Sequence, residues 1–208
     1  MITGNHGRKR LQTGEAGSST EPVADAEHAD ADGRAEKGAE VDKNLAPLIE
    51  RAYEMGAVDA KIIPAEQIVF DPRSHLKCRF GCNRWGRYWT CPPNLRLSQD
   101  QFLEGFRRYR HAMFIKALDP KQGQEISVAI EKEAMLAHNC PFSFALAMCV
   151  QCEACAFPEP CRHPHLARPS MDGYGVDIGR TVESIGFKVE FDKEGKMLPV
   201  WYVMVLLD

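Results

Sequence analysis

Four cysteines lie within thirteen residues in the segment "CVQCEACAFPEPCRHP", at residues 149–164. Their spacing is C-x2-C-x2-C-x5-C, at Cys149, Cys152, Cys155 and Cys161. A tetrahedral zinc site usually takes two C-x2-C pairs from separate places in the chain. Three cysteines at i, i+3 and i+6 instead wrap a short loop around something larger than one ion, as in [4Fe–4S] centres. The final gap of five and the Arg162 that follows Cys161 depart from the usual iron–sulfur run. The pattern predicts a metal site and favours iron–sulfur over zinc.

A second group of cysteines lies upstream in "CRFGCNRWGRYWTCPP", where the spacing is C-x3-C-x8-C at Cys78, Cys82 and Cys91. Gly81 and Gly86 allow the backbone to turn and to bring amide groups near sulfur. A thiol must lose its proton to bind metal, and neighbouring cations favour that loss. Four cations lie in or beside this segment: Lys77, Arg79, Arg84 and Arg87.

The two groups supply seven candidate ligands, which can be shared in more than one way. One cluster can take four cysteines and a second cluster three, which leaves an open iron or an unnamed ligand. Alternatively, Cys161 completes the upstream group. The remaining cysteine, Cys140, could supply an eighth ligand, but it lies apart from both groups and is predicted to be a small buried hydrophobic residue. His163 is predicted to cap a helix or to support a ligand, and Asp172 and Asp177 are predicted to be structural, at the start of a helix.

The composition limits the setting of this site. The chain has 208 residues, eight cysteines and a formal net charge of -3. No apolar run is long enough to span a membrane, and no secretory signal follows the basic "RKR" near the start. We therefore expect a cytoplasmic protein, in which clustered cysteines bind metal rather than form disulfides.

The aromatic and basic residues of the upstream group also suit a nucleic-acid-binding loop. Phe80, Trp85, Tyr88 and Trp89 could stack on bases while the arginines contact phosphates. The ordered part of the chain is formally neutral, however, with 20 residues of each sign outside residues 1–43. We therefore expect these aromatics to shield a cluster from water, and we expect no nucleic-acid partner.

The elements that must position the cysteines alternate between helix and strand. Residues 1–43 are rich in Ala, Gly, Glu and Asp and predict a disordered tail, and residues 44–208 predict one cysteine-rich metal-binding domain. Helices are predicted over 44–56, 98–110, 124–138 and 175–185, with a capping box at Ser98 and Gln101, a cap at Ser170 and a stop at Gly186. Strands are predicted over 60–64, 66–70, 111–118 and 142–149, and a terminal hairpin over 187–207. This order predicts an α+β fold, a single α/β layered domain around one mixed sheet.

Three longer segments together resemble a known family. They are "KCRFGCNRWGRYWTCPP", "CVQCEACAFPEPCRHP" and "ARPSMDGYGVDIGRTVESIGF". In this order they resemble the predicted metal-binding proteins of unknown function (domain of unknown function 2284), over roughly residues 58–190. The resemblance implies metal binding through the seven motif cysteines and implies no particular reaction.

The most favoured reading is a small iron–sulfur protein with one or two [4Fe–4S] clusters, acting in electron transfer or as a redox accessory protein. Its ligands would be Cys78, Cys82, Cys91, Cys149, Cys152, Cys155 and Cys161. The expected partner is a redox protein or a small-molecule substrate, with no membrane. Two alternatives remain: a structural zinc module that presents the aromatic-basic loop to a protein or RNA, and an iron–sulfur enzyme with an open cluster site.

Overall fold

The fold is built on a four-stranded antiparallel sheet. The computed structural model describes residues 44–188, 193–194 and 200–208. The strands are β1 (Asp59–Pro64), β2 (His111–Ala117), β3 (Phe144–Leu146) and β4 (Trp201–Leu207), in the order β1-β2-β4-β3. In the register, Met113 of β2 lies between Ile62 of β1 and Val205 of β4. β2 is buried along its whole length, so it forms the centre of the core.

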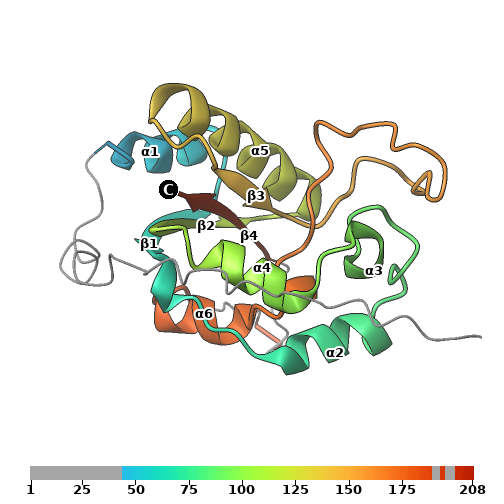
Figure 1. Ribbon diagram of the computed structural model, residues 1–208. Helices are drawn as coiled ribbons and strands as arrows, with labels where there is room; N and C mark the ends of the chain where they lie inside the picture. The colour runs from blue at the N-terminus through green and yellow to red at the C-terminus, as the bar shows by residue number, and fades with distance from the viewer. Residues whose placement is uncertain (1–43, 189–192, 195–199) are drawn as a thin grey trace, which may run out of the picture. The chain divides into compact units, whose positions relative to one another are not determined.

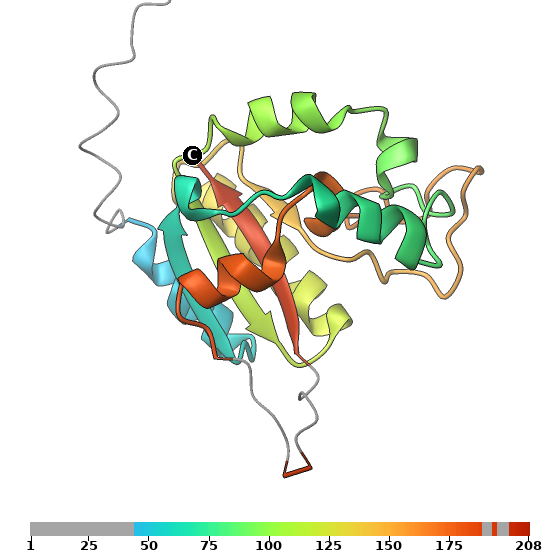
Figure 2. The same ribbon diagram turned by 90° about the horizontal axis from the view of Figure 1, so that it is seen from below.

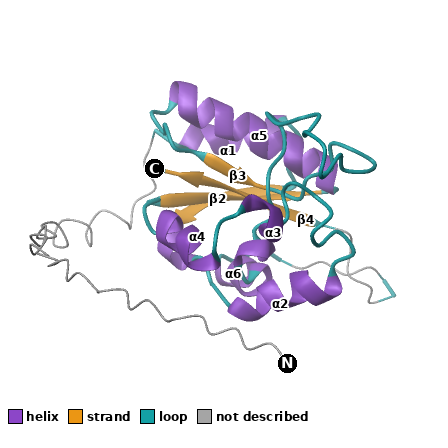
Figure 3. Ribbon diagram, turned by 45° about the vertical axis from the view of Figure 1, so that its right-hand side comes forward, coloured by secondary structure: helices purple, strands orange, loops and turns teal. Residues whose placement is uncertain are grey.

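Helices cover both faces of the sheet (Figures 1 and 3). One face carries α1 (Ala46–Glu54) and the long α5 (Pro120–Ala137), and the other carries α4 (Gln99–Phe106) and α6 (Ile178–Ser184). The remaining elements are η1 (Ala65–Gln67), α2 (Pro72–Gly81), α3 (Pro92–Leu95) and η2 (Asp172–Tyr174). Two hydrophobic clusters result, one under α1 and α5 and one on the opposite face.

Sequence patterns predicted most of the elements that build the core. The α+β class and the single central sheet are confirmed. So is the capping box, in which Gln101 N–H donates to Ser98 Oγ and Ser98 N–H donates to Gln101 Oε1. Gly186, with φ of 75°, follows the last turn of α6 as expected of a helix stop.

The sheet differs from the mixed one that we expected, because every strand pair is antiparallel. β2, α5 and β3 do form a β-α-β unit, since both strands run antiparallel to β4 and therefore parallel to each other. β4 lies between them in the sheet. β4 thus separates the two strands of this unit. β1 and β4 also run parallel to each other and are separated by β2, so the described strands form antiparallel pairs only.

Several local predictions were wrong. Residues 66–70 form η1 and an isolated bridge at Phe70 instead of a strand. The strand predicted over 142–149 is only Phe144–Leu146, so Cys149 lies in the loop beyond it. The last helix is capped by Asp177 rather than Ser170 and begins at Ile178. Most of the first strand and turn of the predicted terminal hairpin, like the predicted tail, lies outside the described residues.

In the part of the chain that the structure describes, none of the helices combines the length and apolar character needed to cross a bilayer.

Candidate metal centre

The upstream cysteines are presented by two short helices. Cys78 lies within α2, Cys82 follows the last residue of α2, and Cys91 immediately precedes α3. α2 begins where the carboxylate of Asp71 accepts a hydrogen bond from Arg73 N–H, with Pro72 in the first turn. Every residue of α2 is exposed or half-buried, so this helix has no buried side chain. The cysteines of α2 therefore lie at the surface of the fold rather than in its core.

The turn between these helices is held by its own hydrogen bonds. The side-chain amide of Asn94 donates to the carbonyl oxygens of Gly86 at 3.2 Å and Tyr88 at 2.6 Å. Gly86 has φ of 71°, a left-handed conformation that glycine adopts without steric cost. The Cys91 thiol donates to the Arg84 carbonyl oxygen at 3.1 Å. These contacts bring Cys91 back toward Cys82, across the eight residues that separate them.

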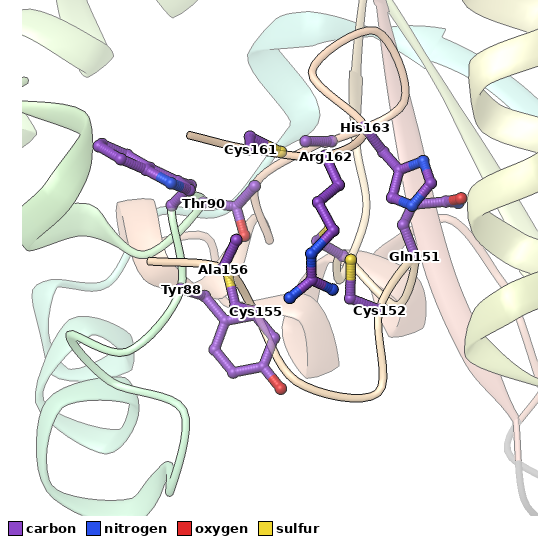
Figure 4. Close-up of a pocket in the computed structure, with 12 residues that line it drawn as sticks. Tyr88, Thr90, Gln151, Cys152, Cys155, Ala156, Cys161, Arg162 and His163 are labelled. Atoms are coloured by element: carbon purple, nitrogen blue, oxygen red, sulfur yellow. The ribbon is translucent and has the colours of Figure 1, made fainter. Parts of the chain in front are cut away.

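The downstream cysteines all line one small cavity (Figure 4). Cys149, Cys152, Cys155 and Cys161 contribute to its wall, together with the side chains of Tyr88 and Thr90 from the upstream turn. Figure 4 shows the guanidinium of Arg162 reaching between Cys152 and Cys155. Arg162 Nη1 donates to the Ala154 carbonyl oxygen at 3.4 Å. A positively charged side chain therefore lies at the wall of the cavity that the four thiols share.

The loop that carries these cysteines is tied to α5 at its base. Gln124 is fully buried, and its side chain accepts from Val150 N–H at 2.9 Å and donates to the Leu166 carbonyl oxygen at 2.7 Å. Ala147 N–H donates to the Pro169 carbonyl oxygen at 2.7 Å. One glutamine side chain thus joins the start of the loop to its end.

A nearly buried ion pair supports the same base. Arg168 Nε donates to Glu131 Oε2 at 2.7 Å, and the two side chains are 13% and 9% exposed. Ala145 N–H donates to the same carboxylate oxygen at 2.6 Å. Arg168 Nη1 also donates to the Ala167 carbonyl oxygen at 2.9 Å. Glu131 therefore links α5, β3 and the end of the cysteine loop.

The two cysteine groups lie next to each other. Arg84 Nη1 donates to the Cys149 carbonyl oxygen at 2.9 Å, and Trp89 Nε1 donates to the Glu159 carbonyl oxygen at 2.8 Å. Figures 1 and 2 show the loop that carries the downstream group running beside α3. The thiol of Cys91 is close enough to Cys82 and Cys155 to interact electrostatically with both. Cys91 therefore lies between the two groups.

The seven predicted ligands share a surface position, and the eighth cysteine does not. Cys82 is exposed and the other six motif cysteines are half-buried. Cys140 is buried in the core cluster beneath α1 and α5, where its thiol donates to the Asp208 carbonyl oxygen at 3.3 Å. Across residues 44–188, 193–194 and 200–208, no three His, Cys, Asp or Glu side chains are already placed around a single ion. The ligand assignment therefore stays a prediction.

Most aromatic residues of the upstream group are engaged within the fold. The Trp85 ring packs edge-on against His75 at 5.1 Å between centroids, and the Trp89 ring packs edge-on against Phe157 at 5.0 Å. The Tyr88 ring has the Arg84 guanidinium 4.9 Å from its centroid. Phe80, by contrast, is 78% exposed. Three of the four aromatics therefore build the site, and one faces solvent.

Asp172 is a site residue that the sequence interpretation did not recognise. It was predicted to be a structural acid at a helix start, a role that Asp177 performs as the cap of α6. Asp172 instead lines an open hollow with Cys78 and Cys82, beside Lys77 and Asn83. The available signal was its place in "RPSMDGYG", one of the segments that carried the family resemblance. His163, also predicted to be supporting, accepts Leu166 and Ala167 N–H at its carbonyl oxygen and lines the downstream cavity.

Burial controls the acidity of two upstream thiols. Desolvation raises the pKa of Cys78 to about 12, and the negative charges of Asp172 and Cys82 add to that effect. Desolvation also raises the pKa of Cys91, while backbone hydrogen bonds involving Tyr88 and Gly86 oppose the rise. In the metal-free protein these thiols therefore hold their protons, and metal binding must release them.

This pKa predicts slow alkylation of Cys78 near neutral pH in chelator-treated protein. Since the thiolate is the reactive form, the rate at Cys78 should rise steeply between about pH 7 and about pH 10. Iodoacetamide labelling followed by peptide mass spectrometry measures the rate at each cysteine. The exposed Cys82 should be labelled before Cys78 at the lower pH. A rate at Cys78 that levels off before about pH 10 would contradict the assigned burial effect, because a thiol with a pKa of about 12 should still gain about tenfold in rate per pH unit there.

Comparison with known proteins identifies the chain at the level of a family. The family model described as "Predicted metal-binding protein (DUF2284)" matches residues 61–207. The match covers both cysteine groups, Asp172 and all but the first two residues of the sheet. No curated protein and no solved structure matches the chain.

Proposed function

The chain belongs to this family of predicted metal-binding proteins, and from that membership we propose that it binds one or two [4Fe–4S] clusters and transfers electrons. The ligands are the seven cysteines of the two groups. The observation that carries the proposal is the cavity whose wall includes Cys149, Cys152, Cys155 and Cys161 together. Thiolates suit iron–sulfur clusters, and the C-x2-C-x2-C run is the spacing that such clusters use.

The surroundings of the sulfurs suit a redox centre. A bound cluster would supply one-electron chemistry, and its potential depends on nearby charge, hydrogen bonds and solvent exposure. Arg162 lines the cavity of the downstream thiols, and Arg84 joins the two groups through the Cys149 carbonyl oxygen. Tyr88 and Thr90 help to close the downstream cavity. These residues would hold positive charge near the cluster and restrict its access to water.

Electrons would enter or leave at the end of α2. Cys82 is the exposed member of the seven ligands, and Phe80 beside it is also exposed. The Arg79 guanidinium lies 5.4 Å from the centroid of the Phe80 ring. An apolar ring flanked by a cation suits a redox protein partner with an acidic surface, which is the partner that we propose. The other three aromatics of the loop, Trp85, Tyr88 and Trp89, pack within the fold. This packing weighs against an RNA-binding loop, in which the rings would be free to stack on bases.

The first experiment is to measure iron, acid-labile sulfide and zinc in anaerobically purified protein, with its visible spectrum. We expect brown protein with near-equal iron and sulfide, at about four atoms of each per chain for one cluster or about eight for two. Reversible bleaching by dithionite would then show a redox-active centre. Colourless protein with stoichiometric zinc that persists after anaerobic reconstitution with iron and sulfide would contradict the proposal, because zinc has no redox chemistry.

A further inference from the structure

The three-cysteine group has an acidic residue beside it that no prediction had assigned to the metal. We propose that the carboxylate of Asp172 is the fourth ligand of a cluster held by Cys78, Cys82 and Cys91. This inference rests on the proposed iron–sulfur function and names the ligand that the cysteine count leaves open. It also accounts for the two groups separately, with four thiols downstream and three thiols and one carboxylate upstream.

Asp172 lies beside two of the three upstream cysteines. It shares the wall of one hollow with Cys78 and Cys82. The hollow is open to solvent, and Lys77, Gly81 and Asn83 form the rest of its wall. The carboxylate comes from η2, more than ninety residues along the chain from Cys78. A ligand from this distant segment completes a group that the local sequence leaves with three sulfurs.

The next residue fixes the position of Asp172 relative to the cysteines. A Cβ atom placed on Gly173 would lie 3.0 Å from Pro92 Cγ and 3.9 Å from the Cys78 sulfur. The η2 backbone is therefore packed directly against α2, which contains Cys78, and against the start of α3, which follows Cys91. His75 Nδ1 lies 3.0 Å from the Gly173 carbonyl oxygen, which joins η2 to α2 a second time. These contacts of Gly173 hold η2, and therefore the Asp172 backbone, beside α2.

One oxygen of the carboxylate has a hydrogen-bond partner. Ser170 Oγ donates to Asp172 Oδ1, so we assign Oδ2 to the metal. Iron accepts carboxylate oxygen as well as thiolate sulfur.

Two other side chains that could bind a metal have different positions or partners. Asp177 caps α6 through Arg180 N–H and pairs with the Arg180 side chain at 3.6 Å. His163 lines the downstream cavity rather than this hollow. Asp172 is thus the acid that the fold brings to the upstream sulfurs.

The test compares wild type with Asp172→Ala, Asp172→Cys and Asp177→Ala, each reconstituted anaerobically with iron and sulfide. After one equivalent of ferricyanide, Asp172→Ala should lose about one iron of four from the upstream cluster and show the EPR signal of a three-iron cluster. Wild type and Asp172→Cys should keep all four irons, because a thiolate can replace the carboxylate as a ligand. Asp177→Ala should lose helix stability without loss of iron.

Three results would overturn the inference. In the first, wild type holds clusters and Asp172→Ala keeps the same iron with no three-iron signal. In the second, loss of iron in Asp172→Ala is not restored in Asp172→Cys, which would indicate a structural role for the residue. In the third, Cys78→Ser keeps the full iron content of wild type while Cys152→Ser holds no iron, which would show that no upstream cluster forms. Each of these keeps the iron–sulfur function, whereas zinc alone in wild type would remove that function as well.

Discussion

Substitution of Cys152 by serine should remove the iron of the downstream cluster, about four atoms per chain. Cys152 lines the cavity shared by the four downstream thiols, and it is the middle cysteine of the C-x2-C-x2-C run that begins at Cys149 and ends at Cys155. A serine hydroxyl is a weaker iron ligand than a thiolate, so the cluster should be lost or become unstable to air. Iron and sulfide analysis and the visible absorbance of anaerobically purified protein measure the loss.

The chain offers a matched control in Cys140→Ala. Cys140 is buried in the core and lies in neither cysteine group, so its removal should cost some stability and no iron. The contrast between the two variants separates loss of a ligand from a general effect of removing a thiol. If Cys152→Ser retained the full iron and sulfide of wild type, the downstream group would not be the cluster site that we propose.

Substitution of Glu131 by alanine should destabilise the fold by about 3 kcal/mol or more. Removal of one partner of a buried ion pair leaves the other charge uncompensated, which typically costs about 3–5 kcal/mol. Here the substitution leaves the Arg168 guanidinium without its carboxylate partner, and it also removes the acceptor of Ala145 N–H on β3. Urea unfolding followed by far-UV circular dichroism should show a lower midpoint for the variant.

Two further variants test whether the ion pair is the cause. Glu125→Ala removes an exposed acid on the same helix, 4.0 Å from Lys121, and should change stability by less than about 1 kcal/mol. The double variant Glu131→Leu with Arg168→Met removes both charges and should recover part of the loss. A Glu131→Ala protein as stable as Glu125→Ala would show that the pair contributes little to the base of the loop.

Local sequence patterns predicted those elements that have a clear apolar face or a capping signal. α1 has Leu48 and Ala52 buried on one side, and α4 carries the Ser98 capping box. α2 escaped prediction because it has no buried side chain and hence no apolar periodicity. Its only start signals are Asp71 and Pro72. The sheet order was also beyond local patterns, because the position of β4 between β2 and β3 depends on contacts across the whole chain.

The same limit applies to the candidate site. Cysteine spacing is a local property, so the two groups could be found from the sequence. The residues that hold the groups in place are remote: Gln124 bonds to backbone 26 and 42 residues away, at Val150 and Leu166. Asp172 reaches the hollow beside Cys78 only because η2 packs on α2. Such contacts require the tertiary fold, and no spacing rule predicts them.

The separation between core and cysteines has a consequence for biogenesis. Both hydrophobic clusters are built from the sheet and its covering helices, and neither contains any of the seven motif cysteines. The sheet can therefore fold before any metal arrives, unlike a zinc finger, whose folding energy comes from its ion. The newly made protein would be a folded acceptor with its thiols already at the surface, suited to receive a preassembled cluster from a donor protein. Cluster delivery would then be a late maturation step rather than a condition of folding.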